Sequence, residues 1–200
     1  MSLIARLDAA RRRLNVLEHP FYRRWESGEL TREELTAYAG EYRHAVVALA
    51  DAAEAAAPIA GSDHADEERE HVALWDEFGS SLGAEEGPAR LDTTRQCVTA
   101  WTSAADPLEA LGILYAVEAS QPEVSRTKLD GLVEHYGFEP DTAATSYFTL
   151  HAERDVEHAA EARELLEHHA GPDDADRIVG AAEAALAGNW RLLDGVEALR

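Results

Sequence analysis

Apolar residues recur three and four positions apart along most of the chain, and no segment alternates apolar and polar residues as a half-buried strand would. This pattern predicts helices over the ranges 2–16, 20–28, 31–57, 63 (or 66)–82, 93–104, 106–136, 141–169 and 174–197. A chain of 200 residues can bury one sizeable core. We therefore expect an all-α bundle of seven or eight helices, forming a single domain over residues 1–200.

Several helix boundaries are marked by capping residues and prolines. Thr31 and Glu34 have the spacing of a capping box at the start of one helix, and Pro58 and Gly61 are expected to break the chain at its far end. Gln121–Pro122 is expected to kink or restart the helix over 106–136. Asp141 is expected to cap the long helix that follows.

The net charge of −21 is extreme for a chain of this length. Binding to a phosphate backbone needs clustered basic side chains, so we expect no nucleic-acid partner. Lys128 is the only lysine among 18 basic residues. A surface rich in carboxylates and poor in lysine resembles that of proteins from salt-loving organisms, where ~1 M salt shortens the Debye length to about 3 Å and screens self-repulsion.

The sequence also bears on compartment and on cysteine chemistry. No run of about 18 apolar residues is present, so we expect no membrane span. The N-terminus lacks the apolar core and cleavage site of a signal peptide, which favours a cytoplasmic protein. Cys97 is the only cysteine, which excludes an intrachain disulfide and a zinc–thiolate site.

The segment "HAERDVEH", residues 151–158, places three potential metal ligands on one helix face. With about 100° per residue, Asp155 lies about 40° from His151 and His158 lies about −20° from it. Two imidazoles and a carboxylate directed to one point form either a metal site or a polar patch on the surface. The neighbours Tyr147 and Ala162 on that face are uncharged, which suits burial.

Glu118 is the charged residue near the end of an otherwise apolar helix, "PLEALGILYAVEASQP". It shares a face with Leu111 and Tyr115, so its carboxylate should be buried. A buried charge is costly unless it is paired or bound to a metal. Glu118 is therefore either a metal ligand or a core carboxylate in a salt bridge, for example with an arginine.

A third group of polar residues lies in "DHADEEREHVALWDEFG". His71 shares a face with Trp75 and should point inward. Glu68 and Glu67 precede it by three and four residues, and His64 by seven, so each could meet its imidazole at one ion. The E-x-x-H pair is the helical ligand unit of di-iron carboxylate bundles, although in a Glu-rich helix it also arises by chance.

Together these segments supply three carboxylates and three imidazoles from three helices. Oxygen and nitrogen donors without thiolate suit iron or manganese, and also zinc. Six donors suit two ions with positions left open for O2, which such a pair of ions could reduce to oxidise a nearby substrate.

The same segments resemble a known family. "HPFYRRWESGELTREELTAYAGEY" is similar to the opening helices of the thiaminase II and PqqC-like (TenA/PqqC-like) group, which has the heme-oxygenase-like fold. "EREHVALWDEFGSSLG", "YAVEASQPEVSRTKLDGLVEHYGF" and "YFTLHAERDVEHA" resemble more closely the heme-oxygenase-like dimetal oxidases, in particular the CADD-like branch. The resemblance covers roughly residues 15–170.

The resemblance implies a set of metal ligands. In this sequence they are Glu68, His71, Glu118, His151, Asp155 and His158, with Glu118 as the bridging glutamate. Some members of the family place a glutamate seven residues before the first histidine, where this chain has His64. Others use E-x-x-H, which Glu68 satisfies, and we choose Glu68 as the ligand. If neither residue serves, the chain would bind only one ion.

The resemblance also bears on residues beyond the ligands. Lys128 follows Glu118 by ten residues, where CADD-like members have a lysine implicated in p-aminobenzoate formation. A surface lysine is the alternative interpretation. Tyr22, Tyr115 and Tyr147 are candidates for pocket or radical-handling roles, with core packing as the alternative. Of these residues, we expect Lys128, Tyr22 and Tyr147 to act in catalysis.

The leading hypothesis is an iron-containing oxidoreductase with two Fe ions, or Fe and Mn. It would activate O2 and oxidise a small organic molecule, including the narrower case of p-aminobenzoate formation. One alternative is a metal-free thiaminase II-like hydrolase, which needs a cysteine nucleophile and has only Cys97. Others are a PqqC-like cofactor oxidase, which Glu118 and Asp155 fit poorly, and a non-catalytic binding bundle. A homodimer is compatible with the fold, although no helix face marks an interface.

Overall fold

The computed structural model describes all residues from 1 to 200, and every regular element in it is helical. The elements are α1 (Leu3–Arg13), η1 (Val16–Glu18), α2 (Pro20–Glu26), α3 (Arg32–Ala60), α4 (Asp63–Leu82), α5 (Asp92–Thr102), α6 (Pro107–Glu118), α7 (Gln121–His135), α8 (Ala143–His169), η2 (Pro172–Asp174) and α9 (Ala175–Glu197). The all-α fold class is confirmed. The structure has nine α-helices rather than seven or eight, because the chain restarts at Gln121 and so separates α6 from α7.

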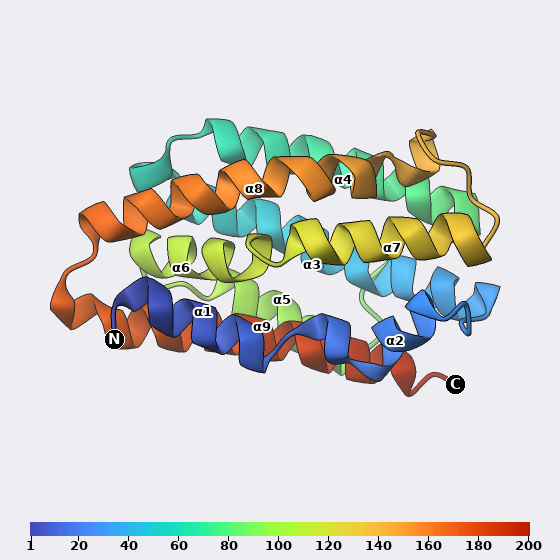
Figure 1. Cartoon of the computed structure of the whole chain (residues 1–200), viewed down its shortest axis with the longest axis horizontal. Helices are drawn as coiled ribbons and strands as arrows, with labels where there is room; N and C mark the ends of the chain where they lie inside the picture. The colour runs from blue at the N-terminus through green and yellow to red at the C-terminus, as the bar shows by residue number, and fades with distance from the viewer.

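The long helices lie along one axis of an elongated bundle (Figure 1). α4 and α8 pack side by side on one face, and α1 and α9 pack together on the opposite face. α6 and α7 follow each other through the middle, where α6 contacts α3, α8 and α9 and α7 contacts α8. No helix combines the length and the apolar character that crossing a lipid bilayer requires.

Helix α3 begins as predicted and ends later than predicted. The Thr31 hydroxyl accepts from the Glu34 amide at 3.2 Å, and the Glu34 carboxylate accepts from the Thr31 amide at 2.7 Å, which completes the capping box. The prediction that Pro58 ends the helix is wrong, since α3 continues to Ala60. Pro58 lies in the last turn, where its missing amide removes a single hydrogen bond, and Gly61 ends the helix with a φ of 83°.

Two further boundaries differ from the prediction. The first helix ends at Arg13 rather than 16, because the Asn15 side chain accepts from the Leu17 amide at 3.1 Å and starts the separate turn η1. Asp141 does not cap α8. It adopts a φ of 57°, and Thr142 is the N-cap, in a capping box with Thr145.

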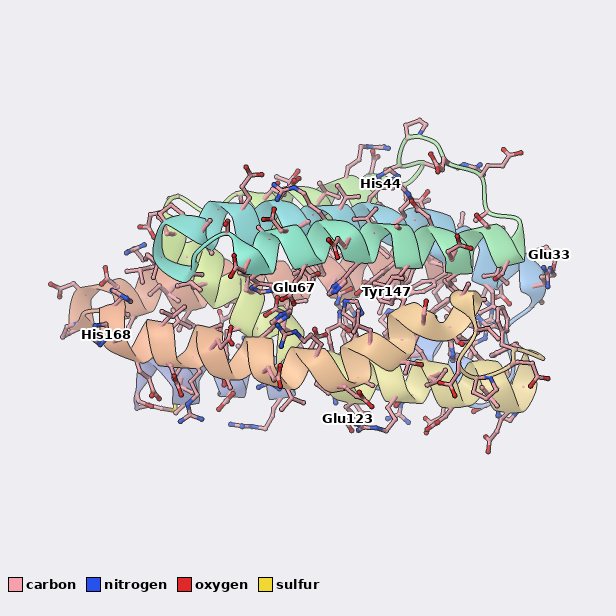
Figure 2. The ribbon with its side chains drawn as sticks, turned by 90° about the horizontal axis from the view of Figure 1, so that it is seen from above. Glu33, His44, Glu67, Glu123, Tyr147 and His168 are labelled. Carbon is pink, nitrogen blue, oxygen red and sulfur yellow. The ribbon has the colours of Figure 1, made fainter.

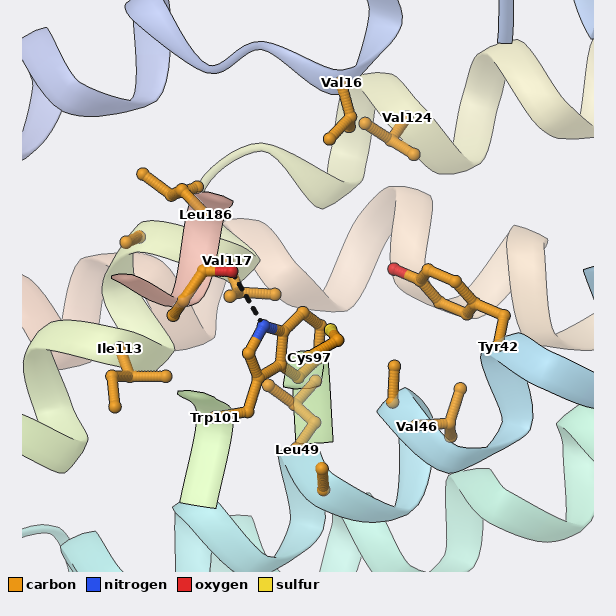
Figure 3. Packing of buried hydrophobic residues seen from close by; sticks show 14 of the residues in the cluster. Val16, Tyr42, Val46, Leu49, Cys97, Trp101, Ile113, Val117, Val124 and Leu186 are labelled. Atoms are coloured by element: carbon orange, nitrogen blue, oxygen red, sulfur yellow. Dashed lines mark hydrogen bonds between the residues drawn. The ribbon is translucent and has the colours of Figure 1, made fainter. Parts of the chain in front are cut away.

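The core is built from aliphatic side chains and from many aromatic rings. Figure 3 shows one part of it, where Tyr42 and Leu49 of α3 lie near Cys97 and Trp101 of α5. The Trp101 indole N–H donates to the Ala185 carbonyl at 3.0 Å, which satisfies its one polar group inside the core. Cys97 is fully buried, and burial raises the pKa of its thiol to about 12.

The contact between α6 and α9 holds the helix that carries Glu118. A Cβ added at Gly112 would lie 2.5 Å from Ile178 Cγ2, so the two helices approach each other at a position where only glycine fits. Gly180 on α9 has nothing within 4 Å of the corresponding position.

We predict opposite effects for alanine at these two glycines. Gly112→Ala should lower the free energy of unfolding by about 1–3 kcal/mol, because the added methyl group overpacks the contact with Ile178. Gly180→Ala should raise it by about 0.5–1 kcal/mol, because it removes backbone entropy without a clash. Urea denaturation measures both variants, and equal stabilisation would contradict the tight contact between α6 and α9.

Candidate metal centre

Three helices bring acidic and imidazole side chains to one buried region. α4 contributes from its first half, α6 from its last residue, Glu118, and α8 from its middle. Figure 2, which looks onto α4 and α8, shows nitrogen and oxygen atoms gathered between these helices, with Glu67 and Tyr147 labelled beside them. Glu68, Glu118, His151, Asp155 and His158 are each at most 1 % exposed, so the solvent-facing patch considered for residues 151–158 is excluded.

The first cluster of potential ligands contains two imidazoles and two carboxylates: His64, Glu68, Glu118 and His158. Their donor atoms all lie within 4.8 Å of one another. His64 Nε2 is 2.9 Å from Glu118 Oε1 and 3.8 Å from Glu68 Oε1. His158 Nδ1 is likewise 3.8 Å from Glu68 Oε1. We call this cluster the outer position, because the His64 side chain at its edge is 13 % exposed.

The second cluster contains Glu68, His71 and His151, and we call it the inner position. His71 Nδ1 is 3.0 Å from Glu68 Oε1, and the rings of His71 and His151 are 4.6 Å apart. Glu68 thus belongs to both clusters. Because both clusters contain Glu68, the two groups of donor atoms lie next to each other.

Most donor atoms of the two clusters have no hydrogen-bond partner. These atoms are His64 Nε2, Glu68 Oε2, both oxygens of Glu118, His151 Nε2 and His158 Nδ1, and both oxygens of the adjacent Asp155 are likewise without a partner. The short approach of His64 to Glu118 is not aligned as a hydrogen bond. Each unsatisfied buried polar atom costs about 1–3 kcal/mol, so a cluster of them is expected where a cation binds. The donors present therefore fit a pair of transition-metal ions.

Asp155 lies beside both clusters without belonging to either. Its Oδ1 is 3.8 Å from His158 Nδ1. Burial, with the nearby carboxylates of Glu118 and Glu68, raises the pKa of Asp155 to about 10. Burial likewise raises the pKa of Glu118 to about 7. Asp155 therefore holds a proton at neutral pH, and Glu118 does so in part, unless a cation replaces the proton.

His151 is oriented by its own helix. Its Nδ1–H donates to the Tyr147 carbonyl at 2.7 Å, and the Tyr147 ring stacks on the imidazole at 3.9 Å. This hydrogen bond sets the tautomer and leaves the lone pair on Nε2, which faces the inner position. Burial lowers the pKa of His151 to about 4, so the imidazole is neutral and available as a ligand.

Five of the six predicted ligands lie in the two clusters, Asp155 lies beside them, and His64 is a further member of the first cluster. A signal for His64 was present in the sequence. Residues 64–71 read H-x-x-x-E-x-x-H and residues 151–158 read H-x-x-x-D-x-x-H, the same face pattern on two helices. The two segments lie side by side and run antiparallel. The His64 ring lies 4.0 Å from that of His158, while the His71 ring lies against that of His151.

Glu67, the other alternative, is not among the donors. Its carboxylate is half-buried and pairs with Arg154 through hydrogen bonds of 2.8 and 2.9 Å, and His158 Nε2 donates to it at 3.1 Å. Glu67 thus lies behind His158, on the side away from the clusters. No arginine reaches Glu118, so pairing of that carboxylate with an arginine is excluded, and its basic neighbour is the imidazole of His64, 2.9 Å away.

Lys128 lies in the interior rather than on the surface. Its ammonium is within 6 Å of five aromatic rings, the nearest being Tyr42 at 4.7 Å and Tyr22 at 5.0 Å. Burial lowers the pKa of Lys128 to about 7, so a neutral amine is accessible near neutral pH.

The three tyrosines named from the sequence have different surroundings. The Tyr22 hydroxyl is 2.7 Å from that of Tyr38, within the aromatic cluster around Lys128. Tyr147 stacks on His151, whereas Tyr115 donates to Asp8 at 2.8 Å near α1 and takes no part in the site.

A surface hollow lies away from the two clusters. It has a volume of about 670 Å³ and is lined by α3 and the loop 84–91, without any residue of the two clusters.

Residues 37–190 match a protein family described as iron-containing redox enzymes. The chain belongs to this family. Two similar relatives are 4-aminobenzoate synthases, from Chlamydia muridarum (31 % identical, 97 % of this chain and 89 % of the relative) and Chlamydia trachomatis serovar D (32 %, 97 % and 91 %). Another, from Nitrosomonas europaea, carries the same name and is 27 % identical over 91 % of this chain and 85 % of the relative. The predicted metal-dependent oxidoreductase class and the CADD-like resemblance are thereby confirmed.

Solved structures confirm the fold. A heme-oxygenase-like domain of unknown function from Shewanella denitrificans has a TM-score of 0.72 and 20 % identity, covering 98 % of this chain and 89 % of that one. A TenA homologue from P. horikoshii has a TM-score of 0.71 and 13 % identity, covering 98 % of both chains. The heme-oxygenase-like, TenA-like architecture is thus the fold of this chain.

The raised pKa of Asp155 predicts a pH dependence of the metal-free protein. Between the unfolded value of 3.8 and the folded value of about 10, the folded state holds a proton that the unfolded state releases. The contribution of Asp155 to the free energy of unfolding is therefore fully present below pH 4. It falls as the pH rises, by up to about 1.4 kcal/mol per pH unit. Asp155→Asn should remove this contribution, so that unfolding free energies measured from pH 5 to 8 decline less steeply.

The exposed position Asp130 on α7 provides the control, and Asp130→Asn should leave the slope unchanged. An unchanged slope in Asp155→Asn would show that the buried carboxyl is ionised in the metal-free protein.

Proposed function

We propose that this protein binds two metal ions, Fe with Fe or Fe with Mn, and uses them to activate O2 for the oxidation of a small organic molecule. The observation that carries the proposal is the pair of buried clusters with Glu68 in common, whose donor atoms lack hydrogen-bond partners. The donors are oxygen and nitrogen atoms, which suit these metals.

Each ion would have its own ligands. His64, Glu118 and His158 would hold the outer ion and His71 and His151 the inner ion. Glu68, which is in both clusters, would hold both ions, in place of Glu118, which the resemblance implied as the bridging residue. Asp155 lies close enough to complete either set. Bound iron or manganese would supply one-electron chemistry and a binding place for O2.

The chain's own residues would prepare the site for this reaction. Packing of α4, α6 and α8 excludes water, which strengthens electrostatic interactions inside. Asp155 and Glu118 would release their protons when the ions bind. The ionised carboxylates of Asp155 and Glu118 would then lie next to the bound ions, together with neutral imidazoles.

We further propose 4-aminobenzoate, or a closely related aromatic amine, as the product. The support is the similarity to relatives named 4-aminobenzoate synthase, together with the only lysine of the chain. Lys128 is buried next to Tyr22 on the interior side of the site, and Tyr147 lies between this cluster and His151. We propose Lys128, Tyr22 and Tyr147 as the residues that act alongside the metals.

The alternative functions have less support. A thiaminase-like hydrolase would need Cys97 as nucleophile, yet this thiol is buried in the core with a raised pKa. A PqqC-like oxidase would use an organic cofactor pocket, whereas the buried carboxylates here favour cations. A cytoplasmic setting, a salt-loving source, a homodimer and the absence of a nucleic-acid partner remain parts of the proposal. The last of these follows from the net charge of −21.

Metal analysis tests the proposal directly. Protein produced with iron and manganese should contain two ions per chain, with anomalous scattering peaks next to Glu118 and His151. Glu68→Ala should reduce the content below one ion, because its carboxylate is common to both clusters. Metal at about 100 times its dissociation constant should stabilise the wild type by about 2.7 kcal/mol and the variant by much less.

The exposed neighbour Glu70 on α4 is the matched control, and Glu70→Ala should keep both ions. Two ions in Glu68→Ala, or none in the wild type, would refute the assignment and favour the non-catalytic binding bundle.

Replacement of Lys128 tests the product assignment. Lys128→Arg, which cannot supply a neutral amine, and Lys128→Met, which keeps the length without nitrogen, should each lower 4-aminobenzoate formation by about 100-fold or more. Chromatography of the product measures the loss, and both variants should retain two ions. Undiminished product in the two variants would exclude a role for the amine.

A further inference from the structure

The two segments that carry the proposed ligands have the same ligand spacing, but a neighbouring residue has opposite charge in the two. Residues 64–71 and 151–158 place their ligands at the same spacing and meet in opposite directions. Three residues after the first histidine, one segment has Glu67 and the other has Arg154. These two side chains therefore occupy equivalent places, and they bind each other through two hydrogen bonds of 2.8 and 2.9 Å.

The Glu67–Arg154 pair lies between solvent and His158. The side chains of Glu67 and Arg154 are 36 % and 33 % exposed, while that of His158 is 1 % exposed. Arg154 also pairs with Glu157 on its own helix. The guanidinium thus holds the Glu67 carboxylate by a bidentate contact, which is more rigid than a single hydrogen bond.

The carboxylate in turn sets the state of the imidazole. His158 Nε2 is 3.1 Å from Glu67 Oε2, and an ionised carboxylate only accepts hydrogen bonds, so this nitrogen carries the proton. The lone pair is therefore on Nδ1, which has no partner and faces Glu68 and Asp155, each 3.8 Å away. His151 has the opposite arrangement, because its Nδ1–H donates to a backbone carbonyl.

We propose that Glu67, held by Arg154, is a positioning residue that fixes His158 in its Nε2–H tautomer and thereby sets the metal affinity of the outer position. A carboxylate behind a ligating histidine orients the ring and raises its basicity, and loss of such a partner typically costs about 10–100-fold in metal affinity. The inner position has no counterpart, because the side chain equivalent to Glu67 is Arg154, which cannot accept a hydrogen bond. The outer ion is thus the one whose binding depends on this ion pair. The metal part of this inference rests on the proposed function, whereas the tautomer does not.

The tautomer is measured in metal-free protein. Nitrogen-15 spectra of the histidine rings at pH 8 should show His158 as the Nε2–H form and His151 as the Nδ1–H form. Glu67→Ala should shift His158 toward a mixture of tautomers and leave His151 unchanged, which makes His151 an internal control. Circular dichroism verifies that the variant is folded, and Glu67→Gln, which keeps an acceptor oxygen, serves as a second variant that should retain the His158 tautomer.

Metal release is measured with Mn²⁺ and Co²⁺ against a chelator. In Glu67→Ala one of the two ions should bind about 10–100-fold more weakly and the other as in the wild type. Arg154→Ala should cause a smaller loss, and the double variant should lose no more than Glu67→Ala, since Arg154 acts through Glu67. Glu70→Ala is the matched control and should bind both ions as the wild type does.

An unchanged His158 tautomer in Glu67→Ala would overturn the proposal, as would equal weakening of both ions. If the wild type binds no metal while the tautomer shift occurs, the proposed function fails and the positioning of His158 by Glu67 stands.

Discussion

The structure depends on holding carboxylates from three helices together where water does not reach. Glu68, Glu118 and Asp155 repel one another when ionised, and burial penalises the charge of each. The bundle opposes this cost with apolar packing on every side, including the close approach of α6 to α9 at Gly112. Cations would relieve the same repulsion, so the groups that destabilise the metal-free fold are the proposed metal ligands.

The site has two ends of different character. The outer end contains His64, Glu118 and the ion pair of Glu67 with Arg154, and part of it contacts solvent. The inner end leads from His151 through Tyr147 to Trp75 and the rings around Lys128. In the proposed function, the metal ions would be nearer solvent at the outer end, and the chemistry on an aromatic amine would take place at the inner end.

Much of this arrangement could be predicted from the sequence. The 3.6-residue period places His151, Asp155 and His158 on one face, and the apolar setting of Glu118 implies its burial. The choice between His64 and Glu68 could not be made in the same way, because residues four apart on a helix share a face and both reach the site. The structure places both residues in one cluster, and the facing segment has the same spacing.

Other features depend on which helices pack against each other, and the hydrophobic period of a single helix does not predict this. The position of Glu67 behind His158 requires the pairing of α4 with α8, and the contact of Lys128 with Tyr42 and Tyr22 requires three separate helices. The rule that a proline ends a helix also failed at the end of α3. Pro58 was read as a break, although a proline in a last turn loses little.

The burial of Lys128 leaves the folded surface without any side-chain primary amine, because no other lysine exists in the chain. Reagents, cross-linkers and modifying enzymes that attack lysine have no target on the native molecule apart from the α-amino group of Met1. Lys128 becomes reachable only when α7 separates from its neighbours. Acylation of this one side chain therefore reports opening of the fold at a single known residue, and no label has to be introduced into the protein.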